Sequence, residues 1–394
     1  MKYIKRLVEE PIRRALQRNK SVLLFGARQT GKTTMISRLD AALTISFVRP
    51  EVRQRYEQSP QLLSGEVEAL PSRIRGRRPL VVVDEVQKVP AILDAVQELI
   101  DRGRANFVLT GSSARKLRRG ASINLLPGRV AAFRMDPFSL REYPTTALND
   151  RLLYGSLPGI LAVPGPSDRE LDLSSYVTTY LEDEVRAEAV VRNVGDFARF
   201  VELAASESGQ IVNCRKLSQE IGVSHTTIAA YYRVLEDCLI AERIEPLTRS
   251  KTRKKLTKSE KYLIFDLGVR RLAAREGAQP SRETFGRLFE QFVGLELLRS
   301  AHAAGPGIAI RFWRDPDGPE VDWVVEAHGR YTPIEVKWTE RPAASDIRHL
   351  ELFLSEYPSA VAGYLVCRVP RPVKLGRRVT ALPWHAVDEL LPPS

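Results

Sequence analysis

The chain reads SVLLFGARQTGKTTMISRL from Ser21 to Leu39, and this stretch decides the fold of its first part. A mostly apolar strand over 21–25 precedes a glycine-rich loop, and apolar residues then recur at helical spacing. The residues that fit the pattern G-x-x-x-x-G-K-[ST] are Gly26, Gly31, Lys32 and Thr33. Because the pattern stands between a strand and a helix, it predicts a phosphate-binding loop in a parallel α/β sheet.

The residue types of this loop suit a bound triphosphate. Its backbone N–H groups can curl around the phosphates, Lys32 can reach the β- and γ-phosphates, and the Thr33 hydroxyl can take a Mg²⁺ position. ATP and Mg²⁺ are therefore the expected cofactors. The residues expected to contact the nucleotide are Gly26, Ala27, Arg28, Gln29, Thr30, Gly31, Lys32, Thr33, Thr34 and, from a later strand, Ser112.

A second stretch, LVVVDEVQKVP from Leu80, supports nucleotide hydrolysis. Its apolar residues predict a buried parallel strand that ends in Asp84 and Glu85. Ligands of α/β sheets bind at the carboxyl ends of such strands. We expect Asp84 to hold Mg²⁺ through water and Glu85 to polarise the attacking water.

A third strand, NFVLTGSS from Asn106, ends in hydroxyl side chains, and here the chain resembles the AAA+ ATPases. The resemblance implies a polar sensor of the γ-phosphate on this strand and an arginine finger from a neighbouring subunit. Arg129, in LPGRVAAFRMDPFSLREY, is the candidate finger, and a finger supplied in trans implies a homo-oligomer such as a hexameric ring. The arginines that compete for this role, or that form a basic face for DNA instead, are Arg115, Arg118, Arg119 and Arg134.

The segment 138–205 is expected to form a helical lid after an AAA+ core over 1–137. The stretches YGSLPGIL and YVTTYLEDEVRAEAV resemble the lid of prokaryotic AAA+ proteins whose C-terminal half is a domain of unknown function. This resemblance covers nearly the whole chain.

A helix-turn-helix pattern follows in CRKLSQEIGVSHTTIAAYYRVLEDCLIAERI, within a winged-helix segment predicted over 206–274. A short amphipathic helix ends at Gly222, and Ser224 is placed to N-cap the second helix. Such a second helix can lie in the major groove of DNA, although the same motif also docks proteins. The outward-facing candidates for DNA contacts are His225, Thr226, Thr227 and Arg233.

The stretch TRSKTRKKLTKSEKYLIF directly after this motif is strongly basic. Between Arg249 and Lys261 there are seven basic residues and one acid, Glu260. A basic loop between strand-like segments is typical of a wing that contacts phosphates, although a charge run can also be only solvated. The further DNA-binding candidates are Arg249, Lys251, Arg253, Lys254, Lys255 and Lys258.

The last domain, expected over 283–394, contains the hairpin EVDWVVEAHGRYTPIEVKW from Glu320. If the turn centres on His328 and Gly329, Asp322 lies opposite Glu335, with Cβ atoms about 5 Å apart. Lys337 lies on the same face. A preceding helix carries Glu290 amid apolar residues, where a carboxylate needs a cation or a hydrogen-bond donor.

These residues resemble the site of the restriction-endonuclease-like nucleases. The resemblance implies that Asp322 and Glu335 ligate Mg²⁺ with help from Glu290, and that Lys337 activates water or stabilises the reacting phosphate. An alternative is a charged sheet surface held by ion pairs.

Composition sets the broad class. The chain has 394 residues, a net charge of +12 and three scattered cysteines, which favours a multidomain cytoplasmic protein with a polyanionic partner and no membrane partner. The sequence predicts an ATP-hydrolysing oligomeric AAA+ protein that binds and remodels or translocates on DNA, including branched DNA. Two alternatives are a nucleotide-gated Mg²⁺-dependent nuclease and a nucleotide-controlled DNA-binding switch of the defence or toxin-antitoxin type.

Overall fold

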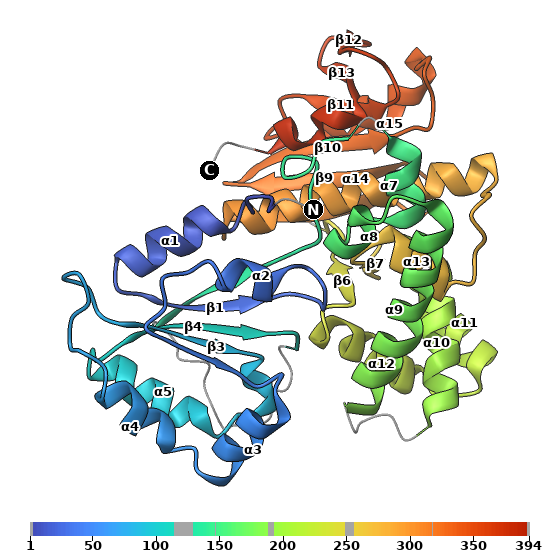
Figure 1. The fold of residues 1–394 in the computed structure, drawn as a ribbon. Coiled ribbons are helices and arrows are strands. Elements are labelled where there is room, and N and C mark those ends of the chain that lie inside the picture. Colours follow the sequence, from blue (N-terminus) through green and yellow to red (C-terminus); the bar gives the residue numbers. More distant parts are fainter. Residues whose placement is uncertain are drawn as a thin grey trace. The chain divides into compact units, whose positions relative to one another are not determined.

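A computed structural model describes residues 3–113, 129–145, 147–187, 193–248, 256–316 and 318–391. The chain forms two compact units (Figure 1). Unit 1 comprises residues 1–137 and a short segment, 237–239. Unit 2 comprises residues 138–236 and 240–394. No helix in the described ranges is both long and apolar enough to cross a membrane.

Unit 1 is built on a five-stranded, wholly parallel sheet in the order β2-β3-β4-β1-β5. The sheet confirms the predicted parallel α/β core. Strand β4 lies between the strand that precedes the glycine-rich loop and the strand that ends in Asp84. The elements are α1 (Glu9–Gln17), β1 (Ser21–Phe25), α2 (Lys32–Ile36), β2 (Leu43–Ser46), α3 (Pro50–Gln58), α4 (Leu62–Glu68), β3 (Leu80–Asp84), η1 (Val86–Lys88), α5 (Ile92–Asp101), β4 (Asn106–Gly111) and β5 (Val130–Arg134).

Alternation along the strands divides the core of unit 1 into two layers. Val22 and Leu24 of β1 pack with buried residues of α1 and α2, whereas Leu23 packs with those of α3, α4 and α5. Figure 1 shows these two sets of helices on opposite faces of the sheet. A sheet covered on both faces exposes its functional groups at the strand ends, where the loops lie.

Unit 2 begins with helices, as expected for 138–205. The elements of its first part are α7 (Leu148–Tyr154), α8 (Pro158–Ala162), α9 (Pro166–Ala187), α10 (Val194–Ser206), α11 (Cys214–Ile221), α12 (His225–Asp237), β6 (Ala241–Ile244), β7 (Lys261–Ile264) and α13 (Leu267–Ala273). Strands β6 and β7 form a two-stranded antiparallel ladder after the two helices of the helix-turn-helix pattern.

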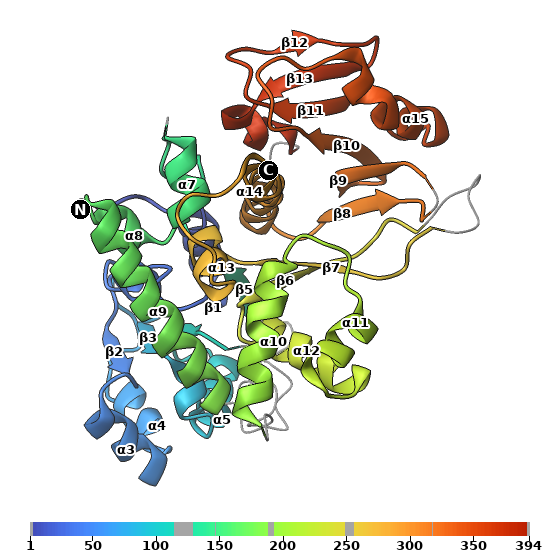
Figure 2. The same cartoon turned by 90° about the vertical axis from the view of Figure 1, so that its right-hand side faces the viewer.

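The second part of unit 2 is a six-stranded mixed sheet in the order β12-β13-β11-β10-β9-β8. Apolar residues of α14 pack against one face and those of α15 against the other, and Figure 2 shows the sheet between these helices. The elements are α14 (Arg282–Ala304), β8 (Ile308–Arg314), β9 (Glu320–Ala327), β10 (Arg330–Val336), η2 (Ala344–Ile347), α15 (Arg348–Glu356), β11 (Gly363–Cys367), β12 (Val373–Lys374), β13 (Val379–Pro383) and η3 (Trp384–Leu390).

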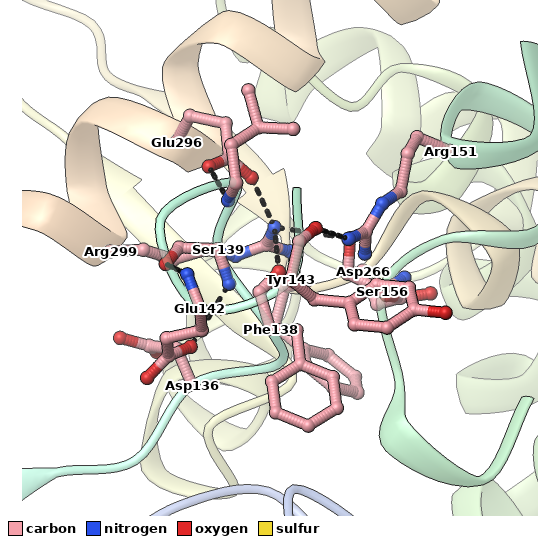
Figure 3. Close-up of polar contacts among 12 residues, drawn as sticks. Asp136, Phe138, Ser139, Glu142, Tyr143, Arg151, Ser156, Asp266, Glu296 and Arg299 are labelled. Atoms are coloured by element: carbon pink, nitrogen blue, oxygen red, sulfur yellow. Dashed lines mark hydrogen bonds and ion pairs between the residues drawn. The ribbon is translucent and has the colours of Figure 1, made fainter. Parts of the chain in front are cut away.

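A buried ionic cluster joins the two parts of unit 2 (Figure 3). Arg299 Nη1 donates to Glu296 Oε1 at 2.7 Å and to the Phe138 carbonyl at 3.2 Å, and the Leu140 amide donates to Glu296 Oε2 at 2.8 Å. Asp266 accepts the Ser156 amide at 2.6 Å and caps α13. The lid, winged-helix and C-terminal segments therefore pack as one compact unit, and the boundaries predicted between them stay predictions.

Candidate functional site

The glycine-rich loop has the backbone geometry of a tight phosphate-binding turn. Gly31, just before α2, has φ of +96°, a value that a side chain disfavours. A Cβ on Gly26 would lie 2.5 Å from the Met135 carbonyl oxygen and 2.9 Å from Thr30 Oγ1. Both positions therefore require glycine, as the motif predicts.

Lys32 lies inside this loop. Its side chain is 5% exposed, and its Nζ donates to the carbonyl oxygens of Gly26 at 2.8 Å and Ala27 at 3.0 Å. Thr30 Oγ1 also donates to the Ala27 carbonyl, at 2.9 Å, which fixes the loop from within. The ammonium group is thus held where the loop backbone encloses it. The structure brings together the loop residues Gly26, Ala27, Arg28, Gln29, Thr30, Gly31, Lys32, Thr33 and Thr34.

Asp84, at the end of β3, collects hydroxyl groups from three other elements. Thr110 Oγ1 donates to its Oδ1 at 2.6 Å, while Thr33 Oγ1 and Ser46 Oγ lie 3.3 Å from its Oδ2. The carboxylate is 1% exposed. Asp84 and Thr33, which are each expected to hold Mg²⁺, therefore lie within hydrogen-bonding distance of each other.

Glu85 follows in a left-handed backbone conformation, with φ of 58°. Such a conformation is costly for a residue other than glycine, and it persists where the surroundings enforce it. Here the Glu85 amide donates to Thr110 Oγ1 at 3.1 Å, and Ser112 Oγ donates to Glu85 Oε2 at 3.1 Å. Gln87 Nε2 donates to Glu85 Oε2 and to Ser112 Oγ. The carboxylate of Glu85, the residue that follows Asp84, is thus held in place by Ser112 and Gln87.

Three residues of this site are not predicted by the sequence. Ser46 and Gln87 contact the polar groups at the strand ends. Ser46 could have been predicted, because it is the polar residue that ends the strand β2. Arg6 had no such signal. It is 5% exposed and donates through Nη1 to the Thr30 carbonyl and through Nη2 to the Asp136 carbonyl, both at 2.6 Å. Arg6 therefore ties the glycine-rich loop to the end of β5.

Arg129, the candidate finger, forms an ion pair with Asp101 within unit 1. It stands just before β5, whose residue Val130 pairs with Ser21 at the start of β1. Arg129 therefore lies at the end of the sheet away from the loop that follows Phe25. Arg134 pairs with Asp136 at 2.9 Å, and Arg115, Arg118 and Arg119 lie outside the described residues.

The C-terminal hairpin has the register that the sequence predicts. His328 and Gly329 both have positive φ, Arg330 pairs with Ala327, and the ladder continues to Ile334 opposite Trp323. The next step in this register places Glu335 opposite Asp322. The Val336 amide donates to Asp322 Oδ2 at 2.8 Å, which holds the two strand ends together.

The carboxylates at this strand end are buried close to one another. Burial and the charge of Asp322 raise the pKa of Glu335 well above the usual range of a glutamate, and the same two causes raise the pKa of Glu290 to about 7. Burial lowers the pKa of Lys337, but Asp322, Glu335 and further nearby carboxylates raise it overall. Lys337 Nζ lies 3.6 Å from Glu335 Oε2. Ionising all of these carboxyls together is therefore unfavourable unless a cation offsets their charge.

The fit of a divalent cation rests on two carboxylates. Glu335 Oε1 is buried and accepts no hydrogen bond from the described residues, with His349 Nδ1 3.8 Å away. Glu290 instead lies 3.3 Å from Lys261 Nζ. Over the described ranges, no group of three or more acidic, histidine or cysteine residues is arranged to hold a metal ion. The expected ligand set of Glu290, Asp322 and Glu335 is thus reduced to the last two.

The helix-turn-helix residues lie on the surface, as the pattern predicts. Ser224 Oγ accepts the Thr227 amide at 3.1 Å and so caps α12. His225, Thr226 and Arg233 are exposed and Thr227 is partly exposed. These side chains are accessible to a ligand.

The basic segment is only partly described. Arg249, Lys251, Arg253, Lys254 and Lys255 lie outside the described residues, and Lys258 is exposed.

The expectation that Lys261 belongs to an exposed wing is wrong. It is 8% exposed, with Nζ 5.0 Å from the centre of the Phe312 ring and 5.4 Å from that of Trp323, because β7 carries it to Glu290. The Leu247 amide donates to the Phe312 carbonyl at 2.7 Å, so one flank of the basic segment runs along β8.

Three families match successive parts of the chain. Residues 18–144 match the family described as "AAA domain". Residues 145–280 match "Domain of unknown function (DUF8612)", and residues 285–387 match "Domain of unknown function (DUF4143)".

Curated relatives and solved structures give weaker likenesses. The uncharacterized proteins Mb2031c of Mycobacterium bovis and Rv2008c of Mycobacterium tuberculosis are each 28% identical over 342 residues, which is 85% of this chain and 74% of theirs. A replication initiator DnaA bound to AMPPCP and single-stranded DNA is 13% identical, with a TM-score of 0.30 over 60% of this chain and 89% of that chain. Protein VC1899 from Vibrio cholerae is 12% identical, with a TM-score of 0.20 over 94% of this chain and 96% of that chain.

The family match and the parallel sheet agree on the first unit. The match begins three residues before β1 and extends beyond β5, so it includes the glycine-rich loop and Asp84. Residues 18–144 are therefore an AAA-type P-loop domain, followed in the chain by two domains of unknown function.

Proposed function

We propose that the protein hydrolyses ATP in unit 1 and uses the cycle to remodel or translocate on DNA, including branched DNA. The observation that carries the proposal is the convergence of Thr33, Ser46 and Thr110 on Asp84, directly beside the glycine-rich loop. Glu85 follows, held by two side-chain donors. This arrangement has a group for each requirement of phosphoryl transfer to water.

The roles of the residues follow from their positions. The loop amides and Lys32 bind the triphosphate, and the dipole at the start of α2 adds to this binding. Glu85 orients the attacking water and accepts its proton, while Ser112 and Gln87 hold the carboxylate in place. Thr33 and Asp84 would hold Mg²⁺, which supplies positive charge against the phosphates.

The position of Arg129 supports an oligomer. Val130 and Phe25 lie at opposite ends of the paired strands, about 13 Å apart at about 3.3 Å per residue. Arg129 is thus remote from the phosphate loop of its own sheet, and action on a phosphate requires the loop of a neighbouring subunit. Its ion pair with Asp101 would have to open for this contact. A ring, such as a hexamer, is the expected assembly.

DNA is the partner that the charge favours. The net charge is +12, and the candidate contacts His225, Thr226 and Arg233 are exposed on α12. The basic residues from 249 to 258 add positive charge close to this motif in the chain. Contacts to phosphates give sequence-independent binding that weakens as salt rises.

The rate of ATP hydrolysis should be measured with single-stranded, duplex and four-way DNA, together with the particle mass with and without nucleotide. We expect one of these DNA forms to raise the rate and nucleotide to favour an oligomer. Arg129→Ala should lower the rate without preventing nucleotide binding. A monomer whose rate is independent of every DNA form would contradict the proposed motor.

The alternative of a regulatory switch differs in its kinetics. A switch of the defence or toxin-antitoxin type binds DNA or a partner according to its nucleotide state, with slow turnover that does not respond to DNA. The DNA dependence of the steady-state rate therefore separates a switch from a motor.

A second candidate function is Mg²⁺-dependent cleavage of DNA in unit 2, gated by the nucleotide. The observation that favours it is the buried Oε1 of Glu335, which accepts no hydrogen bond from the described residues, with Lys337 Nζ 3.6 Å from the other oxygen of Glu335. The carboxylates of Asp322 and Glu335, on opposed positions of paired strands, can share one divalent cation. Lys337 is placed to orient water or to stabilise charge on a phosphate.

Cleavage is tested by incubating the protein with several DNA forms and Mg²⁺ or Mn²⁺. The candidate predicts products that disappear in Asp322→Ala and Lys337→Ala. Glu290→Gln should retain part of the activity, because Glu290 is engaged by Lys261. If no DNA form is cut under any of these conditions, the nuclease candidate is removed.

A further inference from the structure

A basic pocket lies just beyond the end of β10 that carries Glu335. Its volume is about 510 Å³. It is formed at the start of α14, in the turn after β10 and just after β11. We call it the arginine pocket, and its lining residues are Arg282, Trp338, Thr339, Glu340, Arg341 and Arg368.

Trp338 forms a rigid wall of the arginine pocket. Its ring stacks on Phe285 with a centroid distance of 5.3 Å and an interplanar angle of 5°, and Phe289 packs against it edge-on. The guanidinium carbon of Arg368 lies 4.3 Å from the ring centre, within the range of a cation–π contact. The tryptophan therefore holds one arginine of the pocket in a fixed orientation.

Backbone hydrogen bonds fix the rest of the wall. The Lys337 amide donates to the Val366 carbonyl at 3.0 Å, and the Arg368 amide donates to the Thr339 carbonyl at 2.8 Å. The turn after β10 is thus joined to β11 on both sides of Trp338. The pocket is built on sheet positions and does not depend on a free loop.

The charges of the arginine pocket are unbalanced. Arg368 forms an ion pair with Glu340. Arg282 and Arg341 are exposed, and the described part of the chain offers neither of them an ion-pair partner. The pocket is therefore lined by three guanidinium groups and one carboxylate. Arg282 is also the first residue of α14, whose N-terminal dipole favours an anion.

The chemistry of the pocket selects a phosphate group. Guanidinium groups bind phosphate oxygens through pairs of parallel N–H donors, and a partly fixed guanidinium loses less freedom on binding. Trp338 is partly buried and already contacts Phe285 and Arg368, so little of its ring remains for a base to stack on. The pocket is therefore expected to contact the phosphate backbone of a nucleic acid and not its bases.

The location of the arginine pocket indicates which phosphate-bearing ligand it binds. Trp338 follows Glu335 by three residues, so the pocket forms at the same end of β10 as the carboxylate pair. We propose that the arginine pocket binds a backbone phosphate of a nucleic-acid strand that continues past Lys337 and the carboxylate pair. This inference deepens the proposed DNA binding and rests on it, but it requires neither ATP hydrolysis nor cleavage.

The test is the affinity of the full-length protein for a labelled single-stranded oligonucleotide at several salt concentrations. The double variant Arg282→Gln, Arg341→Gln should bind at least about 10-fold more weakly at low salt, and the slope of log K against log salt should fall by about 0.7 for each phosphate that the variant no longer neutralises. Glu340→Gln should bind more tightly, because it frees Arg368. The matched control is Arg330→Gln, an exposed arginine at the other end of β10.

The outcomes separate the inference from the proposed function. If the wild-type protein binds the oligonucleotide and the double variant binds equally well with the same salt slope, the arginine pocket is not a phosphate site, while DNA binding stands. If the wild-type protein binds no nucleic acid at low salt, both are overturned. If the double variant differs from the wild type only on 5′-phosphorylated strands, the pocket binds a strand end, and the continuous path past Lys337 is wrong.

Discussion

Thr110 is the residue that joins the two acids of the nucleotide site. Its hydroxyl donates to Asp84 at 2.6 Å and accepts the Glu85 amide at 3.1 Å, so one oxygen positions both carboxylates. The left-handed backbone at Glu85 depends on such fixed partners. One hydroxyl thus sets the geometry of both carboxylates.

Thr110→Val preserves the shape of the side chain and removes this hydroxyl. We expect the rate of ATP hydrolysis at saturating ATP to fall about 10- to 100-fold, because the water-orienting carboxylate is displaced, while nucleotide affinity changes little. The free energy of unfolding should fall by about 1–3 kcal/mol, since a buried carboxylate loses a donor. Thr44→Val, at an exposed position on β2, is the matched control. Equal kinetics in both variants would show that Thr110 has no positioning role.

Arg6→Gln tests the tie between the glycine-rich loop and the end of β5. The substitution removes the two 2.6 Å hydrogen bonds to Thr30 and Asp136 and leaves their carbonyls without this donor. We expect the dissociation constant of a non-hydrolysable ATP analogue, measured by calorimetry, to rise about 5- to 150-fold, which corresponds to about 1–3 kcal/mol. Arg13→Gln, on the exposed side of α1, should leave this constant unchanged. A folded Arg6→Gln protein of wild-type affinity would refute the tie.

The site residues that the sequence could predict are those that lie next to one another in the chain. The residues of the glycine-rich loop are consecutive, and Asp84 and Glu85 end one apolar run, so local pattern was sufficient to predict them. Arg6 reaches the site only through the packing of α1, which no local pattern encodes. Ser46 is marked locally as the polar end of a strand, but only the strand order brings it to Asp84. Gln87 is two residues from Glu85, but its contact requires the turn of η1.

Helix α14 and the hairpin β9–β10 determine the candidate site of unit 2. The hairpin register was predictable because turn residues and alternating burial allow few pairings. The partner of Glu290 was not, because Lys261 comes from a strand 29 residues earlier in the chain. The basic composition around Lys261 suggested an exposed wing, whereas its position on β7 made it part of the core.

Two glycines of α14 differ in the space that they leave for a side chain. A Cβ on Gly294 would lie 2.5 Å from a ring carbon of Trp323, whereas a Cβ on Gly286 would meet Trp338 Cβ at an ordinary 3.9 Å. Gly294→Ala should lower the free energy of unfolding by about 1–3 kcal/mol through overpacking. Gly286→Ala should raise it by about 0.5–1 kcal/mol, the usual gain in a helix. Chemical denaturation measures both, and a stabilised Gly294→Ala would contradict the close packing of α14 on β9.

The whole molecule combines a nucleotide-binding unit with a larger unit of helices and a mixed sheet. The class of the first was predictable because its glycine-rich loop and the strand that ends in Asp84 are typical of P-loop domains. The boundaries inside the second were not, since the buried cluster of Glu296, Arg299 and Asp266 joins segments that the sequence separates. Subunit number depends on surfaces that a single chain does not specify.

The central claim is that unit 1 hydrolyses ATP through Lys32 and Glu85, and one measurement tests it most directly. The purified full-length protein and its variants are compared for ATP binding and for steady-state phosphate release. We predict that Lys32→Ala loses both, whereas Glu85→Gln binds ATP and releases phosphate at least about 100-fold more slowly than the wild type. A wild-type protein that releases no phosphate with any form of DNA, or variants that release it at the wild-type rate, would contradict the claim.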